Sequence, residues 1–293
     1  MVAAIRVGTA SVNWGFDPLY TWVKLPSFAR MLNEMASAGY AGTEISYNFP
    51  ADVKLLRGEL SSRSLGAAAS FVALDLRDPA RHQEALRTIT PVAERLAALG
   101  SNTVILSDKP SRERIEVAGR VSESDRLDWV RWNAMCEGLN HAGEYLASLG
   151  MQTVFHPHVG TYVETRSEID RLCASTNPAF VGLCPDTGHL AYAGVKPEEI
   201  FVDYASRIKY VHLKDVDAGK LEAVRAGGVD FVNAVRMGLF VELGTGMAGI
   251  GRIIKHLQSA DYAGWLIVEQ DAPANPFESA RRNRRYLLEQ CGI

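Results

Sequence analysis

The fold of the chain can be inferred from the stretch ARHQEALRTITPVAERLAALGSNTVILS (80–107). Residues 80–100 carry apolar side chains at the spacing of an amphipathic helix, whereas NTVILS (102–107) is short, apolar on both faces and contains β-branched side chains. Gly100 lies between the two, where glycine adopts the left-handed turn that ends a helix without steric cost. The stretch therefore predicts a helix that leads into a buried strand of a parallel sheet.

The same alternation continues along the whole chain. Further strands are predicted at 5–10, 42–46, 65–74, 152–157, 180–186, 208–215 and 264–271. Further helices are predicted at 26–39, 125–150, 166–176 and 249–261. Eight strands that alternate with helices predict the α/β class and closure into a (β/α)8 TIM barrel. No linker or internal repeat interrupts the pattern, so we expect a single domain over residues 1–293.

An open, doubly wound sheet is the competing architecture. That fold places a glycine-rich phosphate loop after its first strand, and the segment GTASVNWG (8–15) does not match the GxGxxG pattern. One connection is irregular. The connection at 217–248 is long and contains a helical segment of its own, and such connections at the carboxyl ends of barrel strands shape substrate sites.

The composition excludes several classes of protein. The 293 residues are 47% hydrophobic and 22% charged, which suits a large buried core. The net charge is −3 and no basic stripe is present, which argues against a nucleic-acid partner. We see no signal peptide and no apolar run long enough for a membrane. Four cysteines without a CxxC pair indicate reduced thiols in a cytoplasmic protein, and a homo-oligomer is compatible with the sequence.

Polar residues gather where the later strands end, which is the face at which barrels carry out chemistry. The fifth strand ends in His156 and His158, the sixth in Asp186 followed by His189, the seventh in His212 and Lys214, and the eighth in Glu269. Carboxylates and imidazoles from neighbouring strands form a mixed nitrogen and oxygen site for a divalent ion. Mn²⁺ or Co²⁺ is the leading candidate, with Mg²⁺ and Zn²⁺ as alternatives.

Each of these residues also has a structural interpretation. Asp186 precedes Thr-Gly and could simply cap the sixth helix, Glu269 could belong to an ion pair, and Lys214 could pair with Asp215. A single histidine at a strand end is more often a hydrogen-bonded structural residue than a ligand. The joint placement of the set on consecutive strands favours the metal site.

At these residues the chain resembles the xylose-isomerase-like barrel superfamily of sugar isomerases, epimerases and dehydratases, and within it the inosose dehydratase group. The similar segments are AGYAGTEISYNFP (38–50), HPHVGTYVET (156–165), PDTGHLAYAGVKPEEI (185–200), RIKYVHLKDV (207–216) and YAGWLIVEQD (262–271). They cover most of the chain in register. The resemblance implies a metal set of Asp186, His212 and Glu269, with His156 as the fourth ligand where many epimerases carry glutamate.

The resemblance also implies the reaction. It predicts a hydro-lyase that removes water from a cyclic polyol ketone such as 2-keto-myo-inositol, and an isomerase or epimerase on a non-phosphorylated sugar is the alternative. The base is one of His156, His158 or Lys214, since each could reach a substrate proton. A non-catalytic sugar-binding protein and a zinc-dependent nuclease of the same superfamily are further alternatives, and the single ligand set and the net charge disfavour the nuclease.

Four more residues are candidates for contact with the substrate. Glu44 closes the second strand and could bind a hydroxyl group or form a structural ion pair. Asn13 and Trp14 follow the first strand, and the indole of Trp14 could pack against a sugar ring or cap the barrel core. His189 lies one helical turn after Asp186 and could support a metal ligand.

Overall fold

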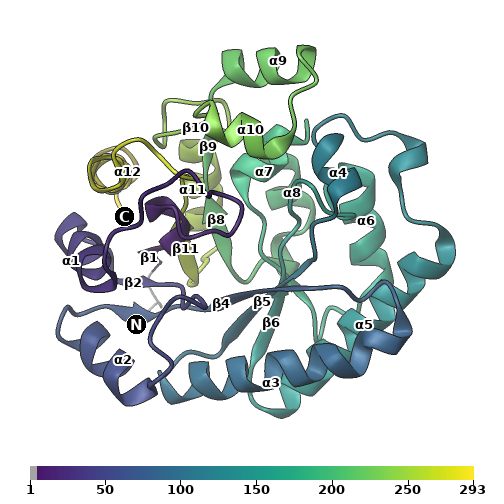
Figure 1. Ribbon diagram of the computed structural model, residues 1–293, viewed down its shortest axis with the longest axis horizontal. Coiled ribbons are helices and arrows are strands. Elements are labelled where there is room, and N and C mark those ends of the chain that lie inside the picture. Colours follow the sequence, from purple (N-terminus) through teal and green to yellow (C-terminus); the bar gives the residue numbers. More distant parts are fainter. Residues whose placement is uncertain (1–4) are drawn as a thin grey trace.

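The computed structural model describes residues 5–293 and is a parallel β-barrel surrounded by helices (Figure 1). The first four residues of the expected domain lie outside the described part. One arc of the barrel has the strand order β3–β2–β1–β11–β8, and the other has the order β4–β5–β6–β7. The bounds are β1 Arg6–Thr9, β2 Gly42–Thr43, β3 Gly66–Ala67, β4 Ser70–Leu74, β5 Thr103–Asp108, β6 Gln152–Phe155, β7 Gly182–Leu183, β8 Val211–Leu213 and β11 Trp265–Val268.

The two arcs join into a closed barrel. Strands β3 and β4 belong to one extended run that is interrupted only at residues 68 and 69. On the opposite side, parallel bridges from Leu183 to Ile208 and from Asp186 to His212 connect β7 to β8. Because all eight predicted runs contribute a barrel strand, the predicted TIM barrel is confirmed.

The five predicted helices are present as α1 Phe28–Ala38, α3 His82–Ala98, α5 Trp129–Ser148, α6 Arg166–Ser175 and α11 Ile250–Ser259. Side-chain caps explain where several of them begin. Ser27 and Asp128 accept hydrogen bonds from backbone N–H groups of the first turns of α1 and α5. The structure adds α2 Val53–Ser61, α4 Arg112–Glu116, α7 Thr187–Tyr192, α8 Pro197–Asp203 and α12 Pro276–Cys291.

Two separate cores stabilise the barrel. The larger core lies between the strands and the surrounding helices. The smaller one fills the barrel interior with Ala10, Ala68, Ala69, Ile105, Val154, Cys184, Tyr210, Trp265 and Ile267. Trp265 can enter this interior because Gly42 has no side chain, since a Cβ there would lie 2.6 Å from the Trp265 ring. The interior is therefore packed with side chains beneath the polar end of the barrel.

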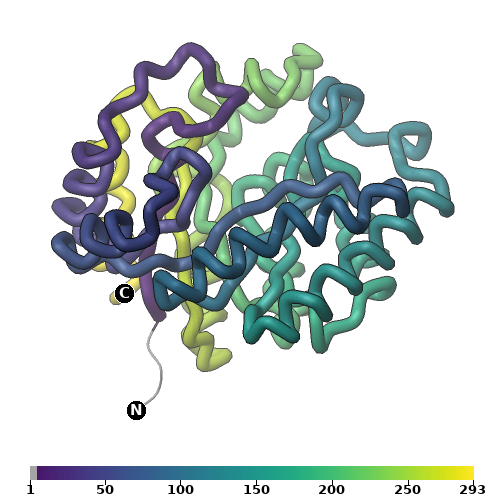
Figure 2. Tube along the Cα trace, turned by 60° about the horizontal axis from the view of Figure 1, so that its bottom comes forward, coloured from purple at the N-terminus to yellow at the C-terminus, as the bar shows by residue number. Residues whose placement is uncertain are grey.

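Two segments cover the rim at the carboxyl ends of the strands (Figures 1 and 2). One is the loop after β1, which begins with the 3-10 turn η1 Ser11–Trp14. The other is the predicted long connection, which contains β9 Asp215–Val216, α9 Ala218–Ala226, α10 Phe231–Arg236 and β10 Phe240–Val241. They touch where the guanidinium of Arg236 lies 4.4 Å from the centre of the Trp22 ring. The loop after β1 lines the site described below, and the long connection contributes Phe231, which packs against His158 and His189.

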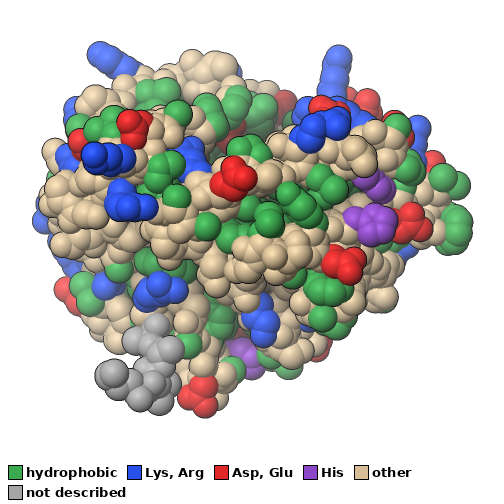
Figure 3. Space-filling view, turned by 90° about the horizontal axis from the view of Figure 1, so that it is seen from below, with side chains coloured by type: hydrophobic (Ala, Val, Ile, Leu, Met, Phe, Trp, Pro, Cys, Tyr) green, Lys and Arg blue, Asp and Glu red, His purple; other side chains and the backbone are tan. Residues whose placement is uncertain are grey.

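The surface carries both signs of charge. The face in Figure 3 shows acidic and basic side chains interspersed with hydrophobic ones, without a continuous basic stripe. Within residues 5–293, no helix combines the length and apolar character that crossing a bilayer requires.

Candidate active site

A cavity of about 540 Å³ opens at the carboxyl ends of the barrel strands. Six of the residues predicted for the site line it: Glu44, His156, His158, His212, Lys214 and Glu269. Asp186 and His189 lie directly behind this wall and contact Lys214. Apolar side chains, among them Phe16, Leu19 and Phe71, also line the cavity. The cavity therefore combines charged and apolar side chains, which is the usual character of a small-molecule site.

Three of the predicted metal ligands converge on one point. His212 Nδ1 lies 3.9 Å from Asp186 Oδ2 and 3.5 Å from Glu269 Oε1. His212 Nδ1 and Asp186 Oδ2 are buried and have no hydrogen-bond partner among the described residues. Buried polar atoms without partners are costly, and a cation between them would satisfy both. The arrangement fits a divalent ion held by one imidazole and two carboxylates.

Local structure orients Asp186 for this role. Its Oδ1 atom accepts hydrogen bonds from the backbone N–H groups of Gly188 and His189, at 2.7 and 2.9 Å, and so caps α7. The capping and metal interpretations of the sequence are therefore compatible, because Oδ1 serves the helix and Oδ2 faces His212. Burial raises the pKa of the Asp186 carboxyl, and the nearby Lys214 ammonium opposes that change.

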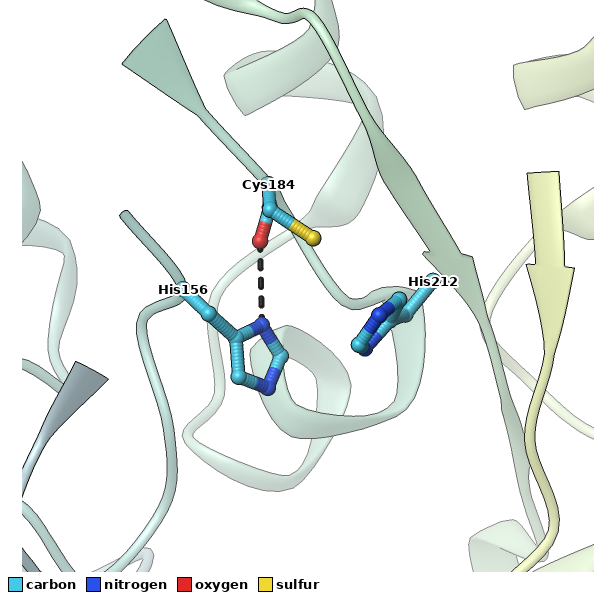
Figure 4. A group of neighbouring side chains, drawn as sticks. All are labelled: His156, Cys184 and His212. Atoms are coloured by element: carbon cyan, nitrogen blue, oxygen red, sulfur yellow. Dashed lines mark hydrogen bonds between the residues drawn. The ribbon is translucent and has the colours of Figure 1, made fainter. Parts of the chain in front are cut away.

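His156 lies beside His212, with the two ring centres 4.7 Å apart. Its Nδ1 atom is 3.0 Å from the carbonyl oxygen of Cys184, so Nδ1 donates and the unshared pair is left on Nε2 (Figure 4). His156, Cys184 and His212 form one group with metal-ligand geometry, and Glu44, His212 and Glu269 form another. Asp186 belongs to no such group but approaches His212 as described. His156 thus presents a free nitrogen next to the candidate metal centre.

The rings of His158 and His189 lie against each other, with ring centres 3.8 Å apart and planes tilted by 40°. His158 Nδ1 lies 2.6 Å from the carbonyl oxygen of Val159, which leaves His158 Nε2 as a hydrogen-bond acceptor. Burial and the charge of Lys214 lower the pKa of His158 to about 4. Phe231 from the rim segment packs against both rings and limits their movement. His158 therefore offers a neutral basic nitrogen to the cavity.

Lys214 is buried among carboxylates. Its Nζ atom lies 2.9 Å from Asp271 Oδ1, 3.1 Å from Glu269 Oε2 and 3.5 Å from Asp186 Oδ2. Burial alone would lower the pKa of Lys214, but these three carboxylates raise it well above its usual value. The ammonium is therefore a stable positive charge. It is poorly suited to the role of base that the sequence left open.

The other predicted substrate contacts divide into two groups. Glu44 lines the cavity, but its Oε1 atom accepts a hydrogen bond from His212 Nε2 at 2.7 Å. Asn13 and Trp14 lie outside the cavity lining, because η1 turns both side chains into the fold. Asn13 donates to Thr9 and to the Val268 carbonyl group and accepts from the Gln270 N–H. The Trp14 indole donates to Glu34 at 2.7 Å.

Two residues of the site were not singled out from the sequence. Asp271 lines the cavity, and alternation along the strand places it on the same face as Glu269, so this signal was available. Tyr20 donates its hydroxyl hydrogen to Asp271 at 2.7 Å. It belongs to the irregular loop after β1, where no periodicity indicates the direction of a side chain.

The fold and the strand-end cluster define a known class of protein. A model of the family described as xylose isomerase-like TIM barrel matches residues 32–290, and the chain belongs to this family. Curated relatives within it carry the name inosose dehydratase. The protein of Geobacillus kaustophilus is 35% identical over 98% of this chain and 94% of its own length. The protein of Clostridium beijerinckii is 34% identical over 99% and 98%. The chain is thus an enzyme whose relatives are hydro-lyases.

Solved structures share the fold at lower identity. The probable 3-DHS dehydratase of Bacillus anthracis superposes with a TM-score of 0.75 at 15% identity, over 97% of this chain and 99% of that one. The IOLI protein with a bound zinc atom gives a TM-score of 0.71 at 14% identity, over 98% of both chains. At this level of identity the likeness concerns the barrel alone.

Proposed function

We propose that the protein is a metal-dependent dehydratase that removes water from a cyclic polyol ketone of the 2-keto-myo-inositol type. The observation that carries the proposal is the convergence of His212 Nδ1, Asp186 Oδ2 and Glu269 Oε1 beside the cavity that His158 and Lys214 also face. The full-length similarity to inosose dehydratases supports the choice of substrate class.

Asp186, His212 and Glu269 would hold the ion, and His156 would offer Nε2 as a fourth ligand. Mn²⁺ and Co²⁺ suit this mixture of imidazoles and carboxylates best. When bound, such an ion acts as a Lewis acid that stabilises negative charge on an oxygen next to a carbonyl group.

His158 is the proposed base because it lines the cavity and, with Nδ1 bonded to the Val159 carbonyl oxygen, carries an unshared pair on Nε2. In the first step, His158 Nε2 takes the proton from the carbon next to the ketone. The electron pair of that C–H bond forms the new double bond, and the C–O bond to the β-hydroxyl breaks. The same proton passes from His158 to the departing oxygen, which leaves as water. The resulting enol then becomes the second ketone of a dione.

Lys214 has a different role. Its buried ammonium would donate hydrogen bonds to a substrate oxygen, and the carboxylates of Asp271 and Glu269 hold it in place. A fixed positive charge in a buried site stabilises negative charge that develops during the reaction. The dehydratase proposal therefore uses Lys214 for binding and orientation and leaves proton abstraction to His158.

The test is to incubate the purified protein with Mn²⁺ or Co²⁺ and 2-keto-myo-inositol in deuterated water and to follow the products by NMR. Formation of the dione supports the proposal. A panel of ketohexoses serves as the comparison. Deuterium incorporation with inversion or rearrangement of a ketose, and no elimination from the inosose, would assign the protein as an epimerase or isomerase instead.

A further inference from the structure

The side-chain carboxylate of Glu44 accepts a hydrogen bond from a proposed metal ligand. Glu44 Oε1 and His212 Nε2 are 2.7 Å apart, and both side chains are buried. Among residues 5–293, no lysine or arginine forms an ion pair with Glu44. Within the described residues, the imidazole of His212 is therefore the group that balances the Glu44 carboxylate.

This hydrogen bond determines the state of the His212 ring. A carboxylate oxygen can only accept a hydrogen bond, so the hydrogen lies on His212 Nε2. In the neutral ring the unshared pair is then on Nδ1. Nδ1 is the atom that lacks a hydrogen-bond partner and points between Asp186 and Glu269. The hydrogen bond at Nε2 thus keeps the unshared pair on Nδ1, the atom that would bind the metal.

We infer that Glu44 is a positioning residue that holds His212 in the Nε2–H form and presents Nδ1 to the divalent ion. Metal-bound histidines commonly donate their second N–H group to a carboxylate, which orients the ring and increases its basicity. Glu44 would then orient the metal ligand His212, in place of the contact with a substrate hydroxyl group that its position at the end of β2 suggested. The inference rests on the proposed function, because it requires a divalent ion at His212.

The geometry of the barrel supports this assignment. Glu44 directly follows β2, and its N–H donates to the Thr9 carbonyl oxygen at 3.2 Å, so its backbone is fixed by the sheet. His212 lies within β8 and pairs with Ile267 of β11. Two rigid strands therefore hold the acceptor and the ring, and the contact crosses the barrel interior from β2 to β8. A support built on strands is more precise than one built on loops.

The test measures Co²⁺ affinity by competition with a chromophoric chelator, and ring tautomers by long-range ¹H–¹⁵N NMR of the metal-free protein. The NMR is done at alkaline pH, where the ring is neutral, because the effect of burial is outweighed by Cys184, Glu269 and Glu44, which raise the pKa of His212 well above its usual value. We expect Glu44→Ala to lose 10- to 100-fold in Co²⁺ affinity and to show mixed tautomers of His212. Glu44→Gln keeps an acceptor oxygen of the same size and should recover part of the affinity. Glu59→Ala removes a surface carboxylate that pairs with Arg63 and should match the wild type.

Two results would overturn the inference, and they are distinguishable. If Glu44→Ala binds Co²⁺ as tightly as the wild type, with an unchanged His212 tautomer and a raised KM, Glu44 binds substrate and only this inference fails. If the wild type itself binds no divalent ion, the proposed function fails and the inference fails with it. Should Glu44→Ala not fold, Glu44→Leu, which is closer to glutamate in size and has no acceptor oxygen, takes its place. A wild-type tautomer spectrum together with wild-type affinity in the variant without an acceptor contradicts the assignment.

Discussion

The Tyr20 hydroxyl donates to Asp271 Oδ2 at 2.7 Å, while Asp271 Oδ1 lies 2.9 Å from Lys214 Nζ. One carboxylate therefore connects the loop after β1 to the buried ammonium of the candidate site. Because Tyr20 and Asp271 are 251 positions apart, this bond also joins the two ends of the barrel sequence. A movement of the loop after β1 would therefore move the Asp271 carboxylate and, with it, the Lys214 ammonium.

The first prediction concerns this coupling. Tyr20→Phe removes one hydrogen bond to a charged group and should lower kcat/KM by about tenfold, or about 1.4 kcal/mol. Co²⁺ affinity should stay within about twofold, because Tyr20 contacts none of the proposed ligands. The matched control is Tyr262→Phe, whose hydroxyl donates to the Trp265 carbonyl group at the opposite end of the barrel. Equal kinetics in the two variants would contradict the coupling.

Asp186→Asn separates metal binding from folding. The asparagine oxygen can still accept from Gly188 and His189 and cap α7, but the charge that faces His212 is lost. We expect Co²⁺ affinity to fall at least about 100-fold, with a loss of less than about 1 kcal/mol in the free energy of unfolding. Calorimetric titration and urea unfolding measure the two effects. Asp217→Asn, which alters the cap of α9, is the control.

His158→Gln should retain the metal and lose turnover. Removing a general base typically costs about 10²- to 10⁴-fold in kcat. His141 is exposed on α5, and His141→Gln provides a variant of the same chemistry away from the cavity. Co²⁺ titration and product formation should be measured on both. Full activity of His158→Gln would remove this residue from the mechanism and transfer the role to another base.

Gly188→Ala tests the space around Lys214. A Cβ at Gly188 would lie 2.6 Å from Lys214 Cγ, so the lysine stem must shift while its head group is held by carboxylates. We expect a loss of about 1–3 kcal/mol in the free energy of unfolding, together with reduced kcat. Gly58→Ala in α2 meets no atom within 4 Å and should stabilise the protein by about 0.5–1 kcal/mol. If Gly188→Ala changes neither the free energy of unfolding nor kcat, the stem of Lys214 is free to shift.

Asp108 should make stability depend on pH. Burial raises the pKa of this carboxyl to about 6, although Arg77 lowers it in part. Because the pKa is raised on folding from about 3.9, the protonated form is favoured in the folded state, and stability is lost as pH rises through 6. Between pH 4.5 and 7.5 this group should remove about 2 kcal/mol from the free energy of unfolding.

The asparagine variant isolates that contribution. Asp108→Asn keeps an oxygen for the Tyr162 N–H and does not titrate. Urea unfolding at the two pH values should therefore show the difference between variant and wild type changing by about 2 kcal/mol in favour of the variant. Asp261→Asn, at an exposed position, should leave the difference unchanged. If the free energies of unfolding of the wild type and of Asp108→Asn change equally between the two pH values, the Asp108 carboxyl does not have a raised pKa.

The barrel was predictable because its strands are buried on both faces, which makes each run apolar and short. The helix at 80–100 and the strand at 102–107 appear as α3 and β5 with boundaries shifted by only a few residues. The helix α12 was not predicted, although Gly292 ends it, because its arginines and glutamates give it little apolar content. Short helices such as α7 are stabilised by a cap and by tertiary contacts more than by periodicity.

The candidate site was predictable where side chains project from strands. Asp186, His212 and Glu269 follow the alternation of β7, β8 and β11, so sequence position determines which way they face. Asn13 and Trp14 lie in a 3-10 turn, and the turn directs them toward the backbone and Glu34 instead of the cavity. The sequence also did not indicate that Glu44 contacts His212, because this contact crosses the barrel and depends on closure of the whole sheet.

The packed side chains of the barrel interior close the cavity on the side that faces the amino ends of the strands. Trp265 and Ile267, together with the other side chains of that interior core, lie between the polar end of the barrel and the opposite end. The exposed side chains of Leu19 and Tyr47 belong to the cavity lining, so we expect a molecule bound at Lys214 to enter and leave on this side. For a reaction that yields a dione and a water molecule, both products share one exit with the incoming substrate. The loop after β1 lines the cavity, so its position would affect the order in which they depart.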